Sequence, residues 1–127
     1  LSEPKKMKMA QDEIVRRSNI TIEIGLDKEH VPSSISWKAD DDPNQNGLQE
    51  CKAMLISLFD RDSKDTLKID LWTKDMQVSE MDRFFFQTLR ALADTYFKAT
   101  QNAKLATELQ HFVQHFGEQT EILPKKK

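Results

Sequence analysis

The chain has 127 residues, of which 38% are hydrophobic and 31% are charged. This length provides one domain with a single core, and the apolar share is too high for a disordered chain. The 19 Lys and Arg residues against 21 Asp and Glu leave a formal net charge of −2, so no overall field attracts nucleic acid. No apolar run approaches the ~20 residues of a membrane-spanning helix, so direct membrane insertion is not expected.

The two ends of the chain are basic, whereas the part between them carries the apolar pattern. Lys and Arg cluster in residues 1–17 and 121–127 without interleaved aromatic residues. We therefore predict a flexible basic N-terminal segment and a basic C-terminal tail around a folded part at residues 18–120. Cys51 is the single cysteine, which excludes an internal disulfide and suits a reducing, cytoplasmic location.

The first predicted elements are two strands. In residues 19–26 apolar side chains occupy every second position, the pattern of a strand with one buried face. The alternation resumes at residues 34–39 and predicts a partner strand. The acidic run Asp40, Asp41 and Asp42 then concentrates turn formers, and we interpret it as a turn that caps a following helix, with weak binding of a divalent ion as the alternative.

A helix is predicted over residues 47–60, because apolar side chains recur there with a helical period. The apolar stripe consists of Leu48, Cys51, Leu55, Leu58 and Phe59. A thiol at Cys51 on this stripe would be buried, protonated and inert.

One more strand and two more helices complete the predicted order. Residues 66–72 alternate again and predict a third strand. A helix is predicted over residues 79–100, opened by a capping box of Ser79 and Asp82, and a last helix over residues 102–117. The order β-β-α-β-α-α predicts a single α+β domain, with a three-stranded, mainly antiparallel sheet and three helices.

The helix at 79–100 carries two apolar stripes about 100° apart, more than one sheet covers. The first stripe consists of Met81, Phe85, Leu89, Leu92 and Tyr96. Phe86, Ala93 and Phe97 form the second. Either the last helix covers this second stripe, or the stripe is an interface for another subunit or a partner.

The sequence contains no group of residues that is typical of a catalytic or metal site. His111 and His115 have the spacing of two zinc ligands, but no second ligand pair accompanies them. The acidic stretch that begins at Asp60 has Asp65 where a calcium loop needs Gly and Leu71 where it needs Glu. Since nucleophile and phosphate-loop motifs are also missing, we predict no enzyme activity, no catalytic or metal-binding residues and no cofactor.

Four stretches of the sequence resemble the GldC family of gliding motility-associated proteins. Two of them are fairly specific, TLKIDLWTKDM from Thr66 and QTLRALADTYFKAT from Gln87; SISWKADDD from Ser34 and KAMLISLFD from Lys52 agree. The similarity covers residues 18–116, although Phe59 stands where similar sequences are expected to have Trp. The resemblance implies a soluble cytoplasmic accessory protein of the motility apparatus, and it supplies no catalytic residues.

We therefore expect a protein that acts through protein–protein contacts, with partners in the gliding motility apparatus or a second copy of itself. Trp72 lies on the polar face of its strand, beside Lys68 and Asp70, and is a candidate interaction anchor together with Phe86 and Phe97. Packing of its ring under the following loop at residues 76–78 is an equal alternative. The alternative is a small-ligand-binding domain, whose pocket between sheet and helices would be lined by residues such as Trp37 and Tyr96.

Overall fold

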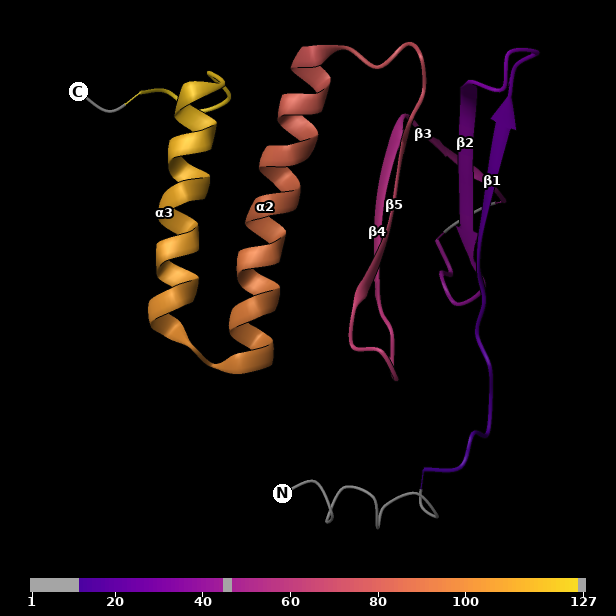
Figure 1. Ribbon diagram of the computed structural model, residues 1–127, viewed down its shortest axis with the longest axis horizontal. Helices are drawn as coiled ribbons and strands as arrows, with labels where there is room; N and C mark the ends of the chain where they lie inside the picture. The colour runs from indigo at the N-terminus through magenta and orange to yellow at the C-terminus, as the bar shows by residue number, and fades with distance from the viewer. Residues whose placement is uncertain (1–11, 45–46, 126–127) are drawn as a thin grey trace. The chain divides into compact units, whose positions relative to one another are not determined.

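The computed structural model of the chain describes residues 12–44 and 47–125. Most of the predicted N-terminal segment and the last two lysines of the predicted C-terminal tail lie outside these residues. The chain divides into two compact units, with the boundary between Lys74 and Asp75. The first unit is built from strands and the second from helices (Figure 1).

The strand unit contains two antiparallel sheets. The first sheet has the strand order β1-β2-β3 and the second the order β4-β5. The strands are β1 (Ile20–Leu26), β2 (Pro32–Ala39), β3 (Gln49–Cys51), β4 (Ala53–Phe59) and β5 (Thr66–Trp72).

The two sheets are joined at Lys52, the one residue between β3 and β4. Its carbonyl oxygen accepts hydrogen bonds from the amide of Thr73 at 2.8 Å and from the Thr73 hydroxyl at 3.3 Å. The next amide, that of Lys74, donates to the carbonyl of Pro32 at 3.2 Å. The chain after β5 thus meets the beginning of β2. Buried Thr73 satisfies its polar groups at this junction, and Ile35 of β2 is the most completely buried large side chain of the described residues.

The predicted helix over residues 47–60 is wrong, because this segment forms β3 and β4. Met54, Ile56 and Leu58 also alternate, and each lies opposite an apolar residue of β5. The cross-strand pairs are Met54 with Leu71, Ile56 with Ile69 and Leu58 with Leu67. A helix would place these side chains around its circumference, whereas the strand keeps them together on one face.

The predicted fold is corrected accordingly. The described residues of this α+β protein contain two helices and two sheets, one of three strands and one of two, instead of three helices and one three-stranded sheet. The acidic run at Asp40–Asp42 caps no helix, since it follows β2 and leads to β3. Asp42 instead closes a turn by accepting a hydrogen bond from the amide of Asn44 at 3.0 Å.

The other predicted elements are confirmed within a few residues, as β1, β2, β5 and the two helices show. The helices are α2 (Val78–Thr100) and α3 (Ala103–Gln119). The beginning of α2 differs in detail: Gln77 is the N-cap, and its amide donates to the Glu80 carboxylate at 3.0 Å, in place of the predicted pair of Ser79 and Asp82.

The second unit is an antiparallel helical hairpin. Gln101 ends α2 in the left-handed conformation, with φ of 61°, and the side chain of Asn102 caps α3 by accepting from the Leu105 amide at 3.1 Å. The contact between the helices buries Phe86, Ala93, Ala106, Val113 and Gly117. Gly117 lies inside α3, which continues to Gln119.

Candidate functional site

Trp72 is the most exposed of the three predicted interaction residues, with 53% of its surface accessible. It ends β5 and lies opposite Ala53. As the strand pattern predicted, its face also carries Lys68 and Asp70, which form an ion pair at 3.0 Å. Phe59 lies on the same face and is exposed. This face of β4 and β5 therefore combines apolar and charged groups, a composition that interaction surfaces share.

Phe86 and Phe97 have different environments. Phe86 is 4% exposed and faces α3, where a Cβ atom placed on Gly117 would lie 2.7 Å from its ring. The last helix therefore covers this residue, and Phe86 is not available as an exposed anchor. Phe97, in the last turn of α2, keeps 39% of its surface accessible and stays a candidate.

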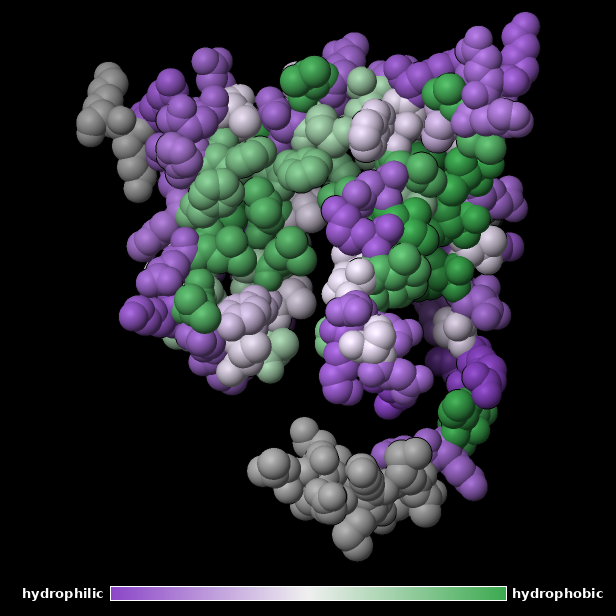
Figure 2. Space-filling model, in the orientation of Figure 1, coloured by the Kyte–Doolittle hydropathy of each residue, from purple (hydrophilic) through white to green (hydrophobic). Residues whose placement is uncertain are grey.

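The helical hairpin has an apolar face beside its helix–helix contact. On each helix, the residue immediately before a contact residue is rotated from it by about 100° around the helix axis. In an antiparallel pair, these preceding residues form one stripe on each helix, and the two stripes lie on the same side of the pair. The stripes contain Phe85, Leu92 and Tyr96 on α2 and Leu105, Phe112 and Phe116 on α3. All but the half-buried Phe116 are exposed. Figure 2 shows apolar residues gathered over both the helices and the strands.

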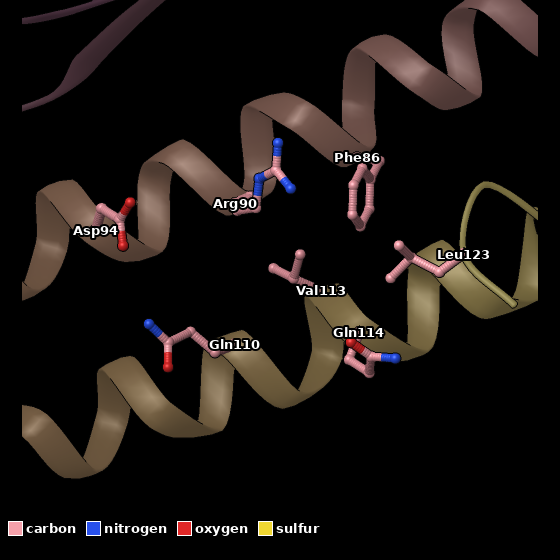
Figure 3. A pocket seen from close by; sticks show the side chains of 7 residues that line it. All are labelled: Phe86, Arg90, Asp94, Gln110, Val113, Gln114 and Leu123. Atoms are coloured by element: carbon pink, nitrogen blue, oxygen red, sulfur yellow. The ribbon is translucent and has the colours of Figure 1, made fainter. Parts of the chain in front are cut away.

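A pocket of about 380 Å³ lies within the hairpin. Its lining comes from α2, α3 and the segment that follows α3, and it consists of Phe86, Arg90, Asp94, Gln110, Val113, Gln114 and Leu123. In Figure 3 the side chains of Phe86, Val113 and Leu123 point toward one another, whereas Asp94 and Gln110 lie at the end away from Leu123. The pocket thus has an apolar end and a polar end. Neither Trp37 nor Tyr96, which the sequence suggested as ligand contacts, lines it.

Arg90 lies between the apolar end and the polar end of the pocket. Its guanidinium carbon lies 5.1 Å from the centre of the Phe86 ring, a cation–π contact. No ion pair or hydrogen bond of the Arg90 side chain is present among residues 12–44 and 47–125. Gln114 is oriented by its own neighbour, because its amide nitrogen donates to the Glu118 carboxylate at 2.7 Å.

The pocket residues were missed by the sequence analysis, although their spacing contains a signal. Arg90 lies between Phe86 and Ala93 on the second stripe of α2, and Gln110 has the same place between Ala106 and Val113 on α3. Each of the two facing apolar stripes is thus interrupted by one polar residue. Such an interruption indicates a gap in the contact between the helices that polar groups line.

The other residues that the sequence raised lie apart. His111 and His115 are exposed on α3, and half-buried Cys51 ends β3 opposite Ile35 instead of lying on a helix. Asp60 serves the β4–β5 loop by accepting from the amides of Asp62 at 3.1 Å and Ser63 at 2.8 Å. These bonds, that of Ser63 first, hold the pKa of Asp60 below its usual value.

Metal-binding clusters and membrane-spanning helices are both absent from the described residues. In the part of the chain that the structure describes, three or more His, Cys, Asp or Glu side chains nowhere converge in a way that holds a metal ion. Within the same residues, neither helix has the length and apolar character needed to cross a membrane.

Fold and site together define a small α+β protein in which a strand unit carries exposed aromatic residues and a helical hairpin carries a mixed pocket. The chain belongs to the GldC-like family, since the model of the family described as gliding motility-associated protein GldC-like matches residues 32–122. This match confirms the resemblance seen in the sequence and associates the chain with gliding motility. Comparisons with curated proteins and with solved structures gave no match.

Proposed function

We propose that this chain is a non-catalytic accessory protein of the bacterial gliding motility machinery and that it acts through protein–protein contacts. Membership of the GldC-like family supports the process. The exposed indole of Trp72 is the observation that carries the mode of action. A cytoplasmic location is part of the proposal, since a reducing compartment suits a chain with one free cysteine.

Trp72 has the properties of an interaction anchor. Trp is among the residues that dominate binding energy at interfaces, because its large ring buries much area and its N–H still finds a partner. On the same face, the Lys68–Asp70 ion pair supplies charge beside Trp72, and Phe59 adds apolar area at the other end of the strands, opposite Thr66. An exposed aromatic anchor next to charged groups is a composition that partner surfaces complement.

The test is recovery of partners from native cells with the parent protein and a Trp72→Ala variant. Truncation of a true anchor costs more than ~2 kcal/mol of binding, so the variant should lose its partners. Leu58→Ala is the matched control, because Leu58 is as exposed as Trp72, at 54%, but lies on the opposite face of β4 and β5. A well-folded Trp72→Ala protein that recovers the same partners as the parent would sink the proposal for this face. Phe97→Ala, examined in parallel, tests the candidate on α2.

The proposed lack of catalytic activity has its own test. Broad screens for hydrolase activity and nucleotide binding should give no signal above buffer, because the sequence offers no nucleophile, ligand set or phosphate loop. Saturable turnover that disappears when Asp70 or His111 is substituted would contradict the non-catalytic part of the proposal.

A further inference from the structure

The pocket in the helical hairpin combines features that the proposed contact function does not use. Its volume of about 380 Å³ lies at the lower end of the ~300–1,000 Å³ that is typical of small-ligand sites. Phe86 and Val113 are buried and form its apolar floor, with Leu123 as a wall. A ligand that fits must therefore be small and must present an apolar body to this end.

The positive charge of Arg90 favours a ligand whose other end carries a carboxylate. A guanidinium that lies over an aromatic ring keeps its N–H donors at its edge, where they match the two oxygens of a carboxylate. Arg90 lies over Phe86 in this way, and within the described residues its guanidinium has no carboxylate partner. The pocket thus offers a fork of donors beside an apolar floor.

The neighbouring groups favour an anion of single charge. Asp94 lines the same pocket one helical turn from Arg90, and Gln114 is bonded to the Glu118 carboxylate. A phosphate with two negative charges would meet one cation and nearby carboxylates, whereas a monocarboxylate needs only the Arg90 fork. Gln110 at the polar end offers a neutral donor and acceptor.

We propose that the pocket between α2 and α3 binds a monocarboxylate with an apolar body, held by the guanidinium of Arg90 over the floor of Phe86 and Val113. The inference goes beyond the proposed contact function and does not rest on it. Such a carboxylate belongs either to a free organic acid or to the carboxyl end of a peptide with an apolar last residue.

The probe is hydrocinnamate, followed by NMR shifts of the backbone amides of the intact protein. We expect saturable shifts centred on the lining residues, with a dissociation constant on the order of 1 mM for so small an acid. Hydrocinnamamide has the same shape without the charge and should bind at least about tenfold more weakly, since it loses the charge-assisted bonds. No saturable shift with the acid, or equal binding of acid and amide, would overturn the proposal without any variant.

Variants then test whether the Arg90 guanidinium holds the carboxylate of the ligand. Arg90→Gln should weaken hydrocinnamate binding about tenfold, and Arg90→Lys should give an intermediate loss because it keeps the charge but not the fork. Lys98→Gln is the matched control: it removes one positive charge from α2 at a residue that does not line the pocket, and it should change binding less than twofold. Circular dichroism checks that each variant keeps its helices. Equal losses in Arg90→Gln and Lys98→Gln would show a general charge effect and overturn the assignment.

A second arm separates the two sources of the carboxylate. A short peptide that ends in Phe is titrated with a free and with an amidated carboxyl end. Tighter binding of the free-ended peptide than of hydrocinnamate supports a chain terminus as the ligand. Binding of hydrocinnamate alone supports a free organic acid, and failure of both acids contradicts the proposal.

Discussion

At the scale of single residues, Asp27 shows how one carboxylate holds a turn and a distant residue of the strand unit. It accepts hydrogen bonds from the amides of Glu29 at 2.8 Å and Val31 at 3.0 Å, and Lys74 forms an ion pair with it at 2.9 Å. The Val31 amide first, and then Lys74, hold the pKa of Asp27 below its usual value.

The lowered pKa of Asp27 predicts a dependence of stability on pH. Because the folded pKa is below the unfolded value of about 3.9, the stabilisation is complete above that value and is lost as the pH falls through the folded pKa. Asp27→Asn should therefore be less stable than the parent at pH 7, and the difference should shrink as the pH falls below about 3.9. Urea unfolding of both proteins across this range measures it.

Lys74→Gln is the control for the contribution of the amides. It removes the ion pair but leaves the two amide donors to Asp27, so it should keep part of the pH dependence. A stability difference between the parent and Asp27→Asn that is the same at every pH would contradict the assignment.

At the scale of elements, the two helices pack closely because Gly117 has no side chain. A Cβ atom there would lie 2.7 Å from the Phe86 ring and 2.7 Å from a methyl group of Leu123. Gly117→Ala gains ~0.5–1 kcal/mol from helix formation but incurs ~1–3 kcal/mol from overpacking, so we expect a net loss of about 1 kcal/mol in the free energy of unfolding.

A double-mutant cycle identifies Phe86 as the source of this cost. In a Phe86→Leu background the ring is absent, and the loss caused by Gly117→Ala should fall by roughly half or more. The measurement is urea unfolding of the parent, the two single variants and the double variant. Strict additivity of the two substitutions would show that Leu123, and not the Phe86 ring, limits the space at this position.

At the scale of the whole molecule, both units present exposed apolar side chains. Phe59 and Trp72 are examples on the strands, and Leu92 and Phe112 on the helices. Exposed apolar surface beyond a few hundred Å² marks interaction surfaces, and it favours self-association when partners are absent. We expect the purified protein to show a mass above 14.8 kDa in light scattering at high concentration and to approach that value on dilution. A constant monomer mass at every concentration would contradict this expectation.

The sequence alone determined the helices and strands whose apolar residues recur with only one period. The strict alternation in β1 and β5 and the long helical period of α2 each fit one kind of structure, so sequence and structure agree there. The face of Trp72 was predictable for the same reason, since side chains alternate along a strand whatever the partner. The family was also evident from short motifs, and the family match over residues 32–122 confirms it.

Tertiary contacts decided what local patterns left ambiguous. Residues 47–60 fit both a helical and an alternating period, and only pairing with β5 selected the strand. Phe86 was readable either as an anchor or as part of the helix contact until its approach to Gly117 showed the contact. The pocket was not predictable at all, because Arg90 and Gln110 lie 20 positions apart and become neighbours in its lining only when α3 folds back on α2. Sequence periodicity reports which face of an element is apolar, but which residues lie opposite that face depends on the packing of distant segments.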